Sequence, residues 1–328
     1  MAVISAKATL IYNPHAGFGN RDASIRRVSQ FWQEHGWQIY IVPTIRAGHA
    51  TELAHRAAED GHGMVLAAGG DGTLNEVANG LANTETILAP LPVGTSNSFA
   101  KELRMPRPNL LEPFKLVDSS KKLLDGRVQQ MDLGYCKVNH QDSGRYWMLW
   151  VGTGADSFVV DQIEPRTKIF KQLGPAGYAA KALFFLPDIP SMRAAITIDD
   201  KEIEDEFLMI TVANCRLYAG GELRLNADAV LDDGRFEVWL FRGQAWASMM
   251  RYILEMGLEN HAHDPNVDMY YAKSVSVETY PPFPFHIDGE PMGQTPFSSK
   301  ICPGALRLLV PESAPAGLFN KVGIPLKI

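Results

Sequence analysis

Short apolar runs alternate with helical patterns over the first third of the chain, from residue 8 to about residue 103. The runs predict four strands and the segments between them predict helices. The predicted strands are 8–12, 38–42, 63–68 and 86–93, and the predicted helices are 23–35, 50–60, 74–81 and 97–103. Such alternation favours a doubly wound α/β domain with a mostly parallel sheet, whose ligands bind outside the carboxyl ends of the strands. The loops that follow the strands are therefore where a site is expected.

From about residue 128 onward, apolar residues recur at every second position between turn residues, which predicts a larger, mostly antiparallel second domain. Asp199-Asp200, Asp233-Gly234 and Asp288-Gly289 are turn signals, the first of them between two strands as a hairpin. The predicted strands are 146–151, 192–198, 201–212, 235–241, 274–278 and 305–310, with helices at 175–186 and 245–259.

Composition sets limits on the class of protein. The chain has 328 residues, of which 46% are hydrophobic and 21% charged, so it should fold, as about two domains. The longest uncharged stretch, 86–100, has 15 residues and is too short to span a bilayer. Because no secretion signal is visible at the N-terminus, we expect a cytoplasmic protein.

Net charge and cysteine content limit which partners and metal sites are expected. A net charge of −6 argues against nucleic acid but leaves a membrane surface open, because a local basic patch acts within a Debye length. Three widely spaced cysteines with no CxxC indicate neither a disulfide framework nor a zinc site, and buried free thiols are expected.

The strongest chemical signal is Gly-Gly-Asp-Gly-Thr-Leu-Asn-Glu at 69–76, between a buried strand and a helix. Three glycines would allow positive φ and bring backbone N–H groups to a phosphate at a helix N-terminus. Asp71 would repel bare phosphate, which indicates a divalent cation between them. The competing interpretation is structural: Thr73 and Glu76 have the spacing of a capping box.

Two further polar loops follow predicted strands, at 13–19 and 92–100. With the glycine-rich loop they should converge on one crevice at the carboxyl edge of the sheet.

Four motifs in this order resemble the diacylglycerol kinase catalytic domain family, which includes bacterial lipid kinases, sphingosine kinases and ceramide kinases. They are Asn13-Pro-x-Ala-Gly, Gly-Gly-Asp-Gly-Thr-x-Asn-Glu at 69–76, Pro-x-Gly-Thr-x-Asn at 92–97 and Asp288-Gly-Glu290. The first part of the glycine-rich motif alone is shared with NAD kinases. The resemblance implies a nucleotide-binding domain over 1–130, a β-sandwich-like lipid-substrate domain over 131–305, and a tail, 306–328, that packs back on the first domain.

The resemblance also implies ATP in the cleft between the domains and Mg²⁺ beside it. Asp71 would join a Mg²⁺ network with Asp132. A structural metal is implied in the loop 230–235, held by the Asp233 carboxylate and two backbone carbonyls, those of Val230 and Arg235, although a plain turn at Asp233-Gly234 is the alternative. The residues implied to line the ATP site are Asn13, Pro14, His15, Ala16, Gly17, Thr44, Gly69, Gly70, Asp71, Gly72, Thr73, Leu74, Asn75, Glu76, Gly94 and Thr95.

The chain departs from the family pattern at two positions. Ser98 stands where the family usually has an aspartate that helps to organise Mg²⁺, so metal affinity should be weaker unless a neighbour compensates. Phe18 stands where many members have a basic residue, for which Arg21 could substitute.

A base for the attacking hydroxyl is expected at Asp288 or Glu290, because the preceding apolar segment 283–287 would raise the proton affinity of a carboxylate. The choice between the two acids stays open, and an exposed acidic turn is the alternative. The apolar segment 175–186, preceded by Arg166, Lys168 and Lys171, would suit docking on anionic lipid, although such a stripe is more often core. His261 and His263 are interpreted as solvated rather than metal-binding.

These features predict an ATP- and Mg²⁺-dependent lipid kinase that phosphorylates a diacylglycerol-like or sphingoid lipid. Its expected partners are ATP, the lipid alcohol and, transiently, a membrane surface; no nucleic acid is expected, and a homodimer is left open. An NAD kinase-like soluble kinase and a degenerate binding module without turnover remain as alternatives. A hydride-transferring Rossmann enzyme is disfavoured because no G-x-G-x-x-G follows the first strand.

Overall fold

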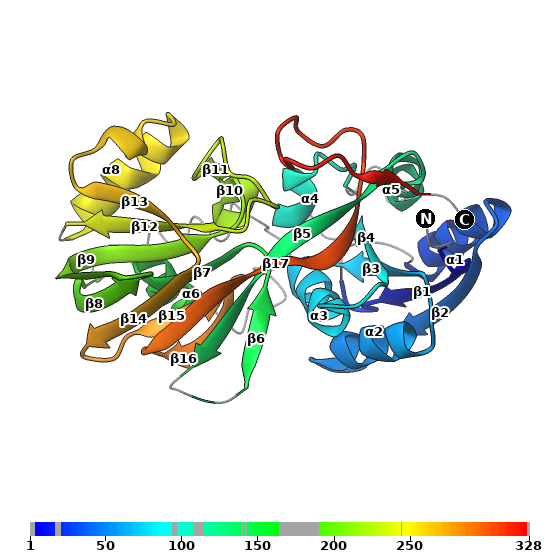
Figure 1. Ribbon diagram of the computed structural model, residues 1–328, viewed down its shortest axis with the longest axis horizontal. Helices are drawn as coiled ribbons and strands as arrows, with labels where there is room; N and C mark the ends of the chain where they lie inside the picture. The colour runs from blue at the N-terminus through cyan, green and yellow to red at the C-terminus, as the bar shows by residue number, and fades with distance from the viewer. Residues whose placement is uncertain are drawn as a thin grey trace. The chain divides into compact units, whose positions relative to one another are not determined.

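The computed structural model describes residues 4–16, 21–93, 97–107, 115–138, 141, 143–163, 190–243 and 245–326. The chain forms two compact units, and each is described by itself (Figure 1). Unit 1 comprises Met1–Asp132, Val230–Asp233 and Pro303–Ile328, and unit 2 comprises Leu133–Ala229 and Gly234–Cys302.

A parallel sheet forms the centre of unit 1, in the order β2-β1-β3-β4 followed by the C-terminal part of β17. Every residue of β3 and β4 is buried, as apolar runs covered on both faces require. The doubly wound unit expected from the sequence is therefore confirmed. Its strands are β1 (Lys7–Tyr12), β2 (Gln38–Pro43), β3 (Met64–Gly69), β4 (Ile87–Pro92) and β17 (Phe297–Val310).

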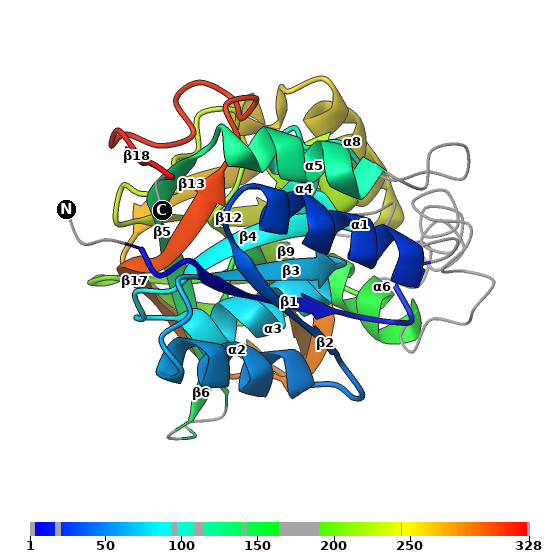
Figure 2. The same ribbon diagram turned by 90° about the vertical axis from the view of Figure 1, so that its right-hand side faces the viewer.

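Helices cover both faces of this sheet. Figure 2 shows α1 and α5 on one face and α2 and α3 on the other. A Cβ at Gly80 would lie 2.4 Å from the Thr51 carbonyl oxygen, so glycine allows α2 and α3 to approach closely. The bounds are α1 (Arg21–Glu34), α2 (His49–Glu59), α3 (Asp71–Leu81), α4 (Ser98–Glu102) and α5 (Lys115–Leu124), of which α5 was not predicted.

Unit 2 is mostly antiparallel, in the order β16-β15-β7-β9-β8-β14 with the N-terminal part of β17, and with β12 between β9 and β13. Its core joins both ends of the unit's sequence, from Cys136 to Ile301. The strands and helices are β5 (Arg127–Val138), β6 (Gly144–Trp147), β7 (Trp150–Gly154), α6 (Ala155–Ile163), β8 (Met192–Ile198), β9 (Lys201–Ala213), β10 (Leu217–Tyr218), η2 (Ala219–Gly221), β11 (Leu223–Arg224), β12 (Phe236–Arg242), α8 (Ala245–Gly257), η3 (His261–His263), β13 (Val267–Ala272), β14 (Ser274–Tyr280), β15 (Pro284–Ile287) and β16 (Glu290–Gln294). A short strand, β18 (Ile324–Pro325), pairs with the start of β5 in unit 1.

The hairpins at Asp199-Asp200 and Asp288-Gly289 are confirmed, with φ of +50° at both Asp199 and Asp288. The single strand predicted over 146–151 is wrong, because β6 ends at Trp147 and β7 begins at Trp150. The break arises because the amides between them bind a side chain instead of a neighbouring strand. The predicted helix at 175–186 and its upstream basic residues lie outside the described residues.

In the described part of the chain, no helix combines the length and apolar character that crossing a membrane requires.

Candidate active site

The loops of unit 1 meet where the strand order reverses, between β1 and β3. The Asn13 amide donates to the Ala68 carbonyl at 3.1 Å, and the Thr44 amide donates to the Tyr12 carbonyl at 2.9 Å. The loops after β1, β2 and β3 are therefore neighbours at the carboxyl edge of the sheet, which is where ligands bind in open α/β folds.

The glycines of the loop after β3 leave space that a side chain would fill, and they do not adopt unusual backbone dihedrals. Gly69 ends β3, Gly70 has φ of −89° and Gly72 lies in the first turn of α3, so the expected positive φ is wrong. A Cβ at Gly69 would lie 2.4 Å from the Thr73 side chain, whereas a Cβ at Gly70 would meet no atom of the described residues within 4 Å. Gly70 thus leaves open space in front of the N-terminus of α3, where a phosphate can approach backbone N–H groups.

Asp71 ties this loop to the loop after β4. Its Oδ2 accepts the Ser98 amide at 2.8 Å and its Oδ1 accepts the Phe99 amide at 3.1 Å. Asn97 strengthens the connection, because its Nδ2 donates to the Gly69 carbonyl at 3.2 Å while its Oδ1 caps α4. The buried Ser98, at the position of the family aspartate, therefore contributes its backbone to Asp71.

The C-terminal residues of the glycine-rich motif, 74–76, make contacts inside unit 1. Leu74 and Asn75 are buried, and Asn75 Oδ1 accepts from Asn79 at 2.6 Å. Glu76 caps α2, since its carboxylate accepts the amides of Gly48 at 2.9 Å and Ala50 at 3.0 Å. The capping-box alternative is wrong, because Gly70 caps α3 without a side-chain hydrogen bond.

The loop after β1 is a compact turn. The Asn13 Oδ1 accepts the His15 amide at 2.8 Å, and the Asn13 carbonyl accepts the Ala16 amide at 3.1 Å. Pro14 lies within this turn and is partly buried. The remaining predicted residues of these loops, Gly17, Phe18, Gly94 and Thr95, lie outside the described residues, as does the side chain of Arg21.

Two further carboxylates near the proposed metal sites, Asp132 and Asp232, accept backbone amides. Asp132 is buried, and its Oδ1 accepts the Gly304 amide at 2.6 Å. In the turn that contains Val230 and Asp233, the buried side chain is Asp232, which accepts the amides of Asn320 at 2.6 Å and Lys321 at 2.9 Å.

The outer part of that turn is more open. Asp233 is partly exposed, and the Arg235 guanidinium lies over the Tyr271 ring at 4.8 Å. Among the residues that the structure describes, no three His, Cys, Asp or Glu side chains form a cluster able to hold a metal ion. The structural metal stays a prediction.

The donor set at the carboxyl edge fits a nucleotide-borne Mg²⁺. Each Asp71 oxygen accepts one of the two amides, and hard carboxylate oxygen is what Mg²⁺ prefers. An ion that arrives with phosphates needs one or two carboxylates rather than a complete protein cage.

The two acids of the Asp288–Glu290 turn have different surroundings. The Asp288 carboxylate accepts three buried amides, those of Met148 at 3.0 Å and of Leu149 and Trp150 at 2.9 Å each. Burial raises the pKa of Asp288, and the three N–H groups oppose the rise. Glu290 is half-exposed, with Oε2 2.6 Å from Arg145 Nη1.

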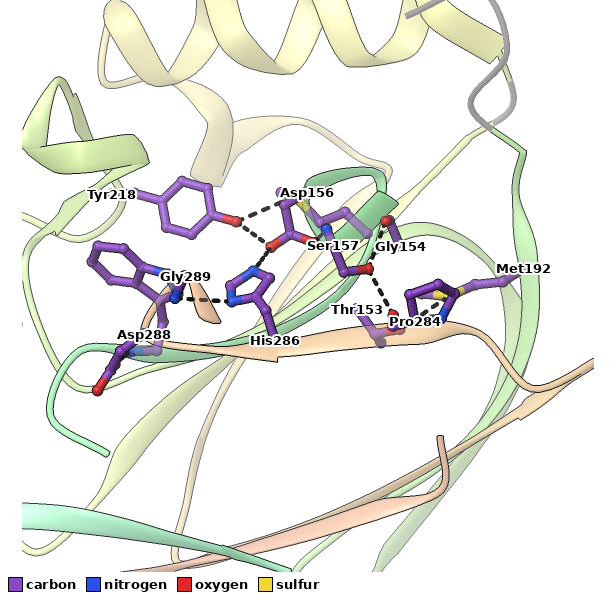
Figure 3. A network of polar contacts seen from close by, with 12 residues as sticks. Thr153, Gly154, Asp156, Ser157, Met192, Tyr218, Pro284, His286, Asp288 and Gly289 are labelled. Carbon is purple, nitrogen blue, oxygen red and sulfur yellow. Dashed lines mark hydrogen bonds and ion pairs between the residues drawn. The ribbon is translucent and has the colours of Figure 1, made fainter. Parts of the chain in front are cut away.

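A polar network that the sequence analysis missed adjoins this turn (Figure 3). His286 Nε2 lies 3.0 Å from Asp156 Oδ2, and the Tyr218 hydroxyl donates to the same oxygen. These residues come from β15, α6 and β10, and the pairs are separated by 130 and 62 positions, so no local pattern could have grouped them.

The interpretation of His261 as solvated is wrong. His261 is 4% exposed, and its Nε2 lies 2.7 Å from the Leu225 carbonyl oxygen. Burial lowers the pKa of its imidazole, which favours a neutral core histidine. His263 is exposed, as expected.

A doubly wound unit, combined with a mostly antiparallel unit, defines the class as a two-unit α/β protein. Comparison with family models then gives a specific match for each part. Residues 7–136 match the diacylglycerol kinase catalytic domain, and residues 150–310 match the YegS C-terminal NAD kinase beta sandwich-like domain.

Curated relatives agree with both matches. A diacylglycerol kinase of Bacillus subtilis (strain 168) is 30% identical over 295 residues, which cover 88% of this chain and 91% of that protein. A probable lipid kinase YegS-like protein of Alcanivorax borkumensis is 28% identical over 319 residues, covering 95% of this chain and 99% of that protein. The chain belongs to the diacylglycerol kinase catalytic domain family, and the resemblance predicted from its motifs is confirmed.

Solved structures support the fold. One from Bacillus anthracis str. Sterne, titled as a diacylglycerol kinase, is 22% identical with a TM-score of 0.68. Another from the same organism is 24% identical with a TM-score of 0.73, and each covers 94% of this chain and 98% of its own. The predicted fold class, an α/β unit combined with a β-sandwich-like unit, is confirmed.

Proposed function

We propose that this protein transfers the γ-phosphoryl group of ATP to the hydroxyl of a diacylglycerol-like or sphingoid lipid. The observation that carries the proposal is the junction at the carboxyl edge of unit 1, where Asp71 joins the loops after β3 and β4 beside the open space at Gly70. Membership of the family supports the lipid as acceptor, since the curated relatives are named diacylglycerol kinase or lipid kinase.

The nucleotide half of the reaction falls to unit 1. Backbone N–H groups at the N-terminus of α3 would bind phosphate oxygens in front of Gly70, where no atom of the described residues lies within 4 Å of the position of a Cβ. Asp71 would hold Mg²⁺ through its carboxylate oxygens, with Asp132 as a further candidate. When bound, Mg²⁺ would neutralise charge on the phosphates as the phosphoryl group leaves.

The acceptor half falls to unit 2, and Glu290 is the better of the two candidate bases. The Asp288 carboxylate already accepts three amides, so taking a proton there would disturb the backbone that it holds. Glu290 is half-exposed, and Arg145 orients one of its oxygens. Its other oxygen would accept the proton of the attacking hydroxyl.

The test is transfer of labelled γ-phosphate to a panel of lipid alcohols in mixed micelles, with NAD in plain buffer as the competing acceptor. Labelled lipid is expected. Labelled NAD without lipid product would favour the NAD kinase alternative, and no product with either acceptor would favour a binding module.

Two variants assign the residues within that assay. Glu290→Gln should lower kcat by about 100-fold or more, the usual contribution of a general base. Its matched control is Glu204→Gln, which removes a carboxylate from a similar exposed ion pair, 2.6 Å from Arg193, elsewhere in unit 2. Equal kcat for wild type and Glu290→Gln would remove Glu290 from the mechanism.

Asp71→Asn should lower kcat and shift half-saturation to higher Mg²⁺, because a carboxylate ligand is lost. Asp232→Asn is its control, since Asp232 also accepts two consecutive backbone amides of unit 1. If both variants lose activity only in proportion to their loss of stability, Asp71 holds the loop and not the metal.

A further inference from the structure

The network beside the Asp288–Glu290 turn is built from buried groups. The His286 side chain is 2% exposed and the Asp156 side chain 10%, and Tyr218 is 6% exposed as a residue. The second Asp156 oxygen, Oδ1, accepts the Ser157 amide at 2.6 Å. Figure 3 shows Tyr218 and His286 both reaching toward Asp156. The Asp156 carboxylate therefore accepts from the Ser157 amide and the Tyr218 hydroxyl and lies within hydrogen-bond distance of His286 Nε2.

These directions select one tautomer of His286. A carboxylate oxygen is a hydrogen-bond acceptor, so a hydrogen bond between His286 and Asp156 places the hydrogen on His286 Nε2. In the neutral ring Nδ1 then has a free lone pair, and the Gly289 amide lies 3.4 Å from Nδ1. The opposite tautomer would leave two acceptors facing each other at Asp156 and two donors facing each other at Gly289.

The neighbouring strand β7 leaves room for this pair. A Cβ on Gly152 would lie 2.2 Å from Asp156 Oδ2 and 2.7 Å from His286 Nε2. Gly152 pairs with His286 in the β7–β15 register, so a side chain there would displace the contact directly. The arrangement thus depends on four elements that meet at one point, α6, β7, β10 and β15.

We propose that His286 is a positioning residue, whose Nε2–H tautomer, set by Asp156, orients the Asp288–Glu290 turn through the Gly289 amide. The inference rests on the proposed function, in which Glu290 accepts the proton of the lipid hydroxyl. Gly289 directly precedes Glu290, and Arg145 holds the far end of the Glu290 side chain at 2.6 Å. His286 and Arg145 together would fix the two ends of the base.

Two substitutions test the contacts of the two imidazole nitrogens one at a time. His286→Asn places an amide oxygen near the position of Nδ1 and can accept from Gly289, but it cannot reach Asp156. His286→Gln places an amide near the position of Nε2 and can donate to Asp156, but it leaves Gly289 without its acceptor. Tyr218→Phe is the matched control, because it removes a donor from Asp156 without touching the turn.

If His286 positions the turn, His286→Gln should lower kcat by about 10-fold or more, a size typical of small misplacements of a catalytic group, with little change in the lipid KM. His286→Asn and Tyr218→Phe should keep kcat within about threefold. A merely structural role predicts the reverse order, since His286→Asn leaves the buried Asp156 with one donor fewer. That reverse order, or equal kcat for all variants, overturns the proposal.

Two readouts do not depend on turnover, and so distinguish failure of this inference from failure of the proposed function. Side-chain ¹⁵N spectra of wild type should show His286 protonated at Nε2 and bare at Nδ1. Hydrogen exchange of the Gly289 amide should quicken about 10-fold in His286→Gln and little in His286→Asn. If wild type phosphorylates no lipid, the proposed function fails, but these two measurements still decide the role of His286. A proton on Nδ1, or equal exchange of the Gly289 amide in both variants, overturns the positioning role.

Discussion

Asp288→Asn tests whether this acid holds the backbone. The substitution keeps size and shape, and asparagine tolerates the φ of +50° at this position. An amide oxygen in place of Oδ1 could still accept Leu149 and Trp150, but an amide nitrogen in place of Oδ2 would face the Met148 N–H, donor against donor. One unsatisfied buried amide costs about 1–3 kcal/mol, and loss of the charge adds to that, so the free energy of unfolding should fall by about 2–3 kcal/mol.

Urea unfolding followed by tryptophan fluorescence measures this change, because Trp147 and Trp150 flank the amides concerned. Glu290→Gln is the comparison in the same turn: its ion pair with Arg145 is 23% and 44% exposed, so it should lose no more than about 1 kcal/mol. If the free energy of unfolding of Asp288→Asn lies within about 0.5 kcal/mol of wild type, the structural role is refuted. A buried donor that faces another donor costs more than that.

Two further predictions concern groups away from the turn. Glu76→Ala should lower the free energy of unfolding by about 1–2 kcal/mol, because the amides of Gly48 and Ala50 at the N-terminus of α2 lose their acceptor. Thermal melts followed by circular dichroism measure this change, and an unchanged melting temperature would contradict the capping role of Glu76. Burial raises the pKa of the Cys136 thiol to about 12. A thiol-reactive label added to native protein at pH 8 should therefore modify the half-buried Cys302 well before Cys136. Equally fast labelling of both would show that solvent reaches Cys136.

The strands of unit 1 could be predicted within about one residue because each is a continuous apolar run between turn residues. β3 and β4 are buried on both faces, and that burial requires the uninterrupted apolar pattern seen in the sequence. The start of α3 was placed three residues late, at Leu74 instead of Asp71. Glycines on either side of Asp71 suggested a loop, whereas Gly72 sits in the first helical turn, where tertiary contacts outweigh its low helix propensity.

Unit 2 was harder to predict because long-range polar contacts shape it. The break between β6 and β7 depends on Asp288, more than 130 positions along the chain, and no local property of Met148 or Leu149 signals it. The same holds for His286 and Asp156. The sequence predicted the turn at Asp288-Gly289 correctly, yet it could not assign separate roles to Asp288 and Glu290, because those roles depend on which backbone amides each carboxylate meets.

Asp71, Glu76, Asp232 and Asp288 share a property that complicates the study of this family from sequence: each accepts two or more backbone amides. Loss of activity on replacing such an acid is therefore ambiguous, because a released loop and a lost ligand both lower kcat. The two causes differ in their response to Mg²⁺. A metal ligand shifts the ion's half-saturation and is partly compensated by excess ion, whereas a released loop lowers stability at every Mg²⁺ concentration. Only Asp71 combines this bonding with partial exposure at the carboxyl edge of the parallel sheet, so among the four only Asp71→Asn should respond to added Mg²⁺.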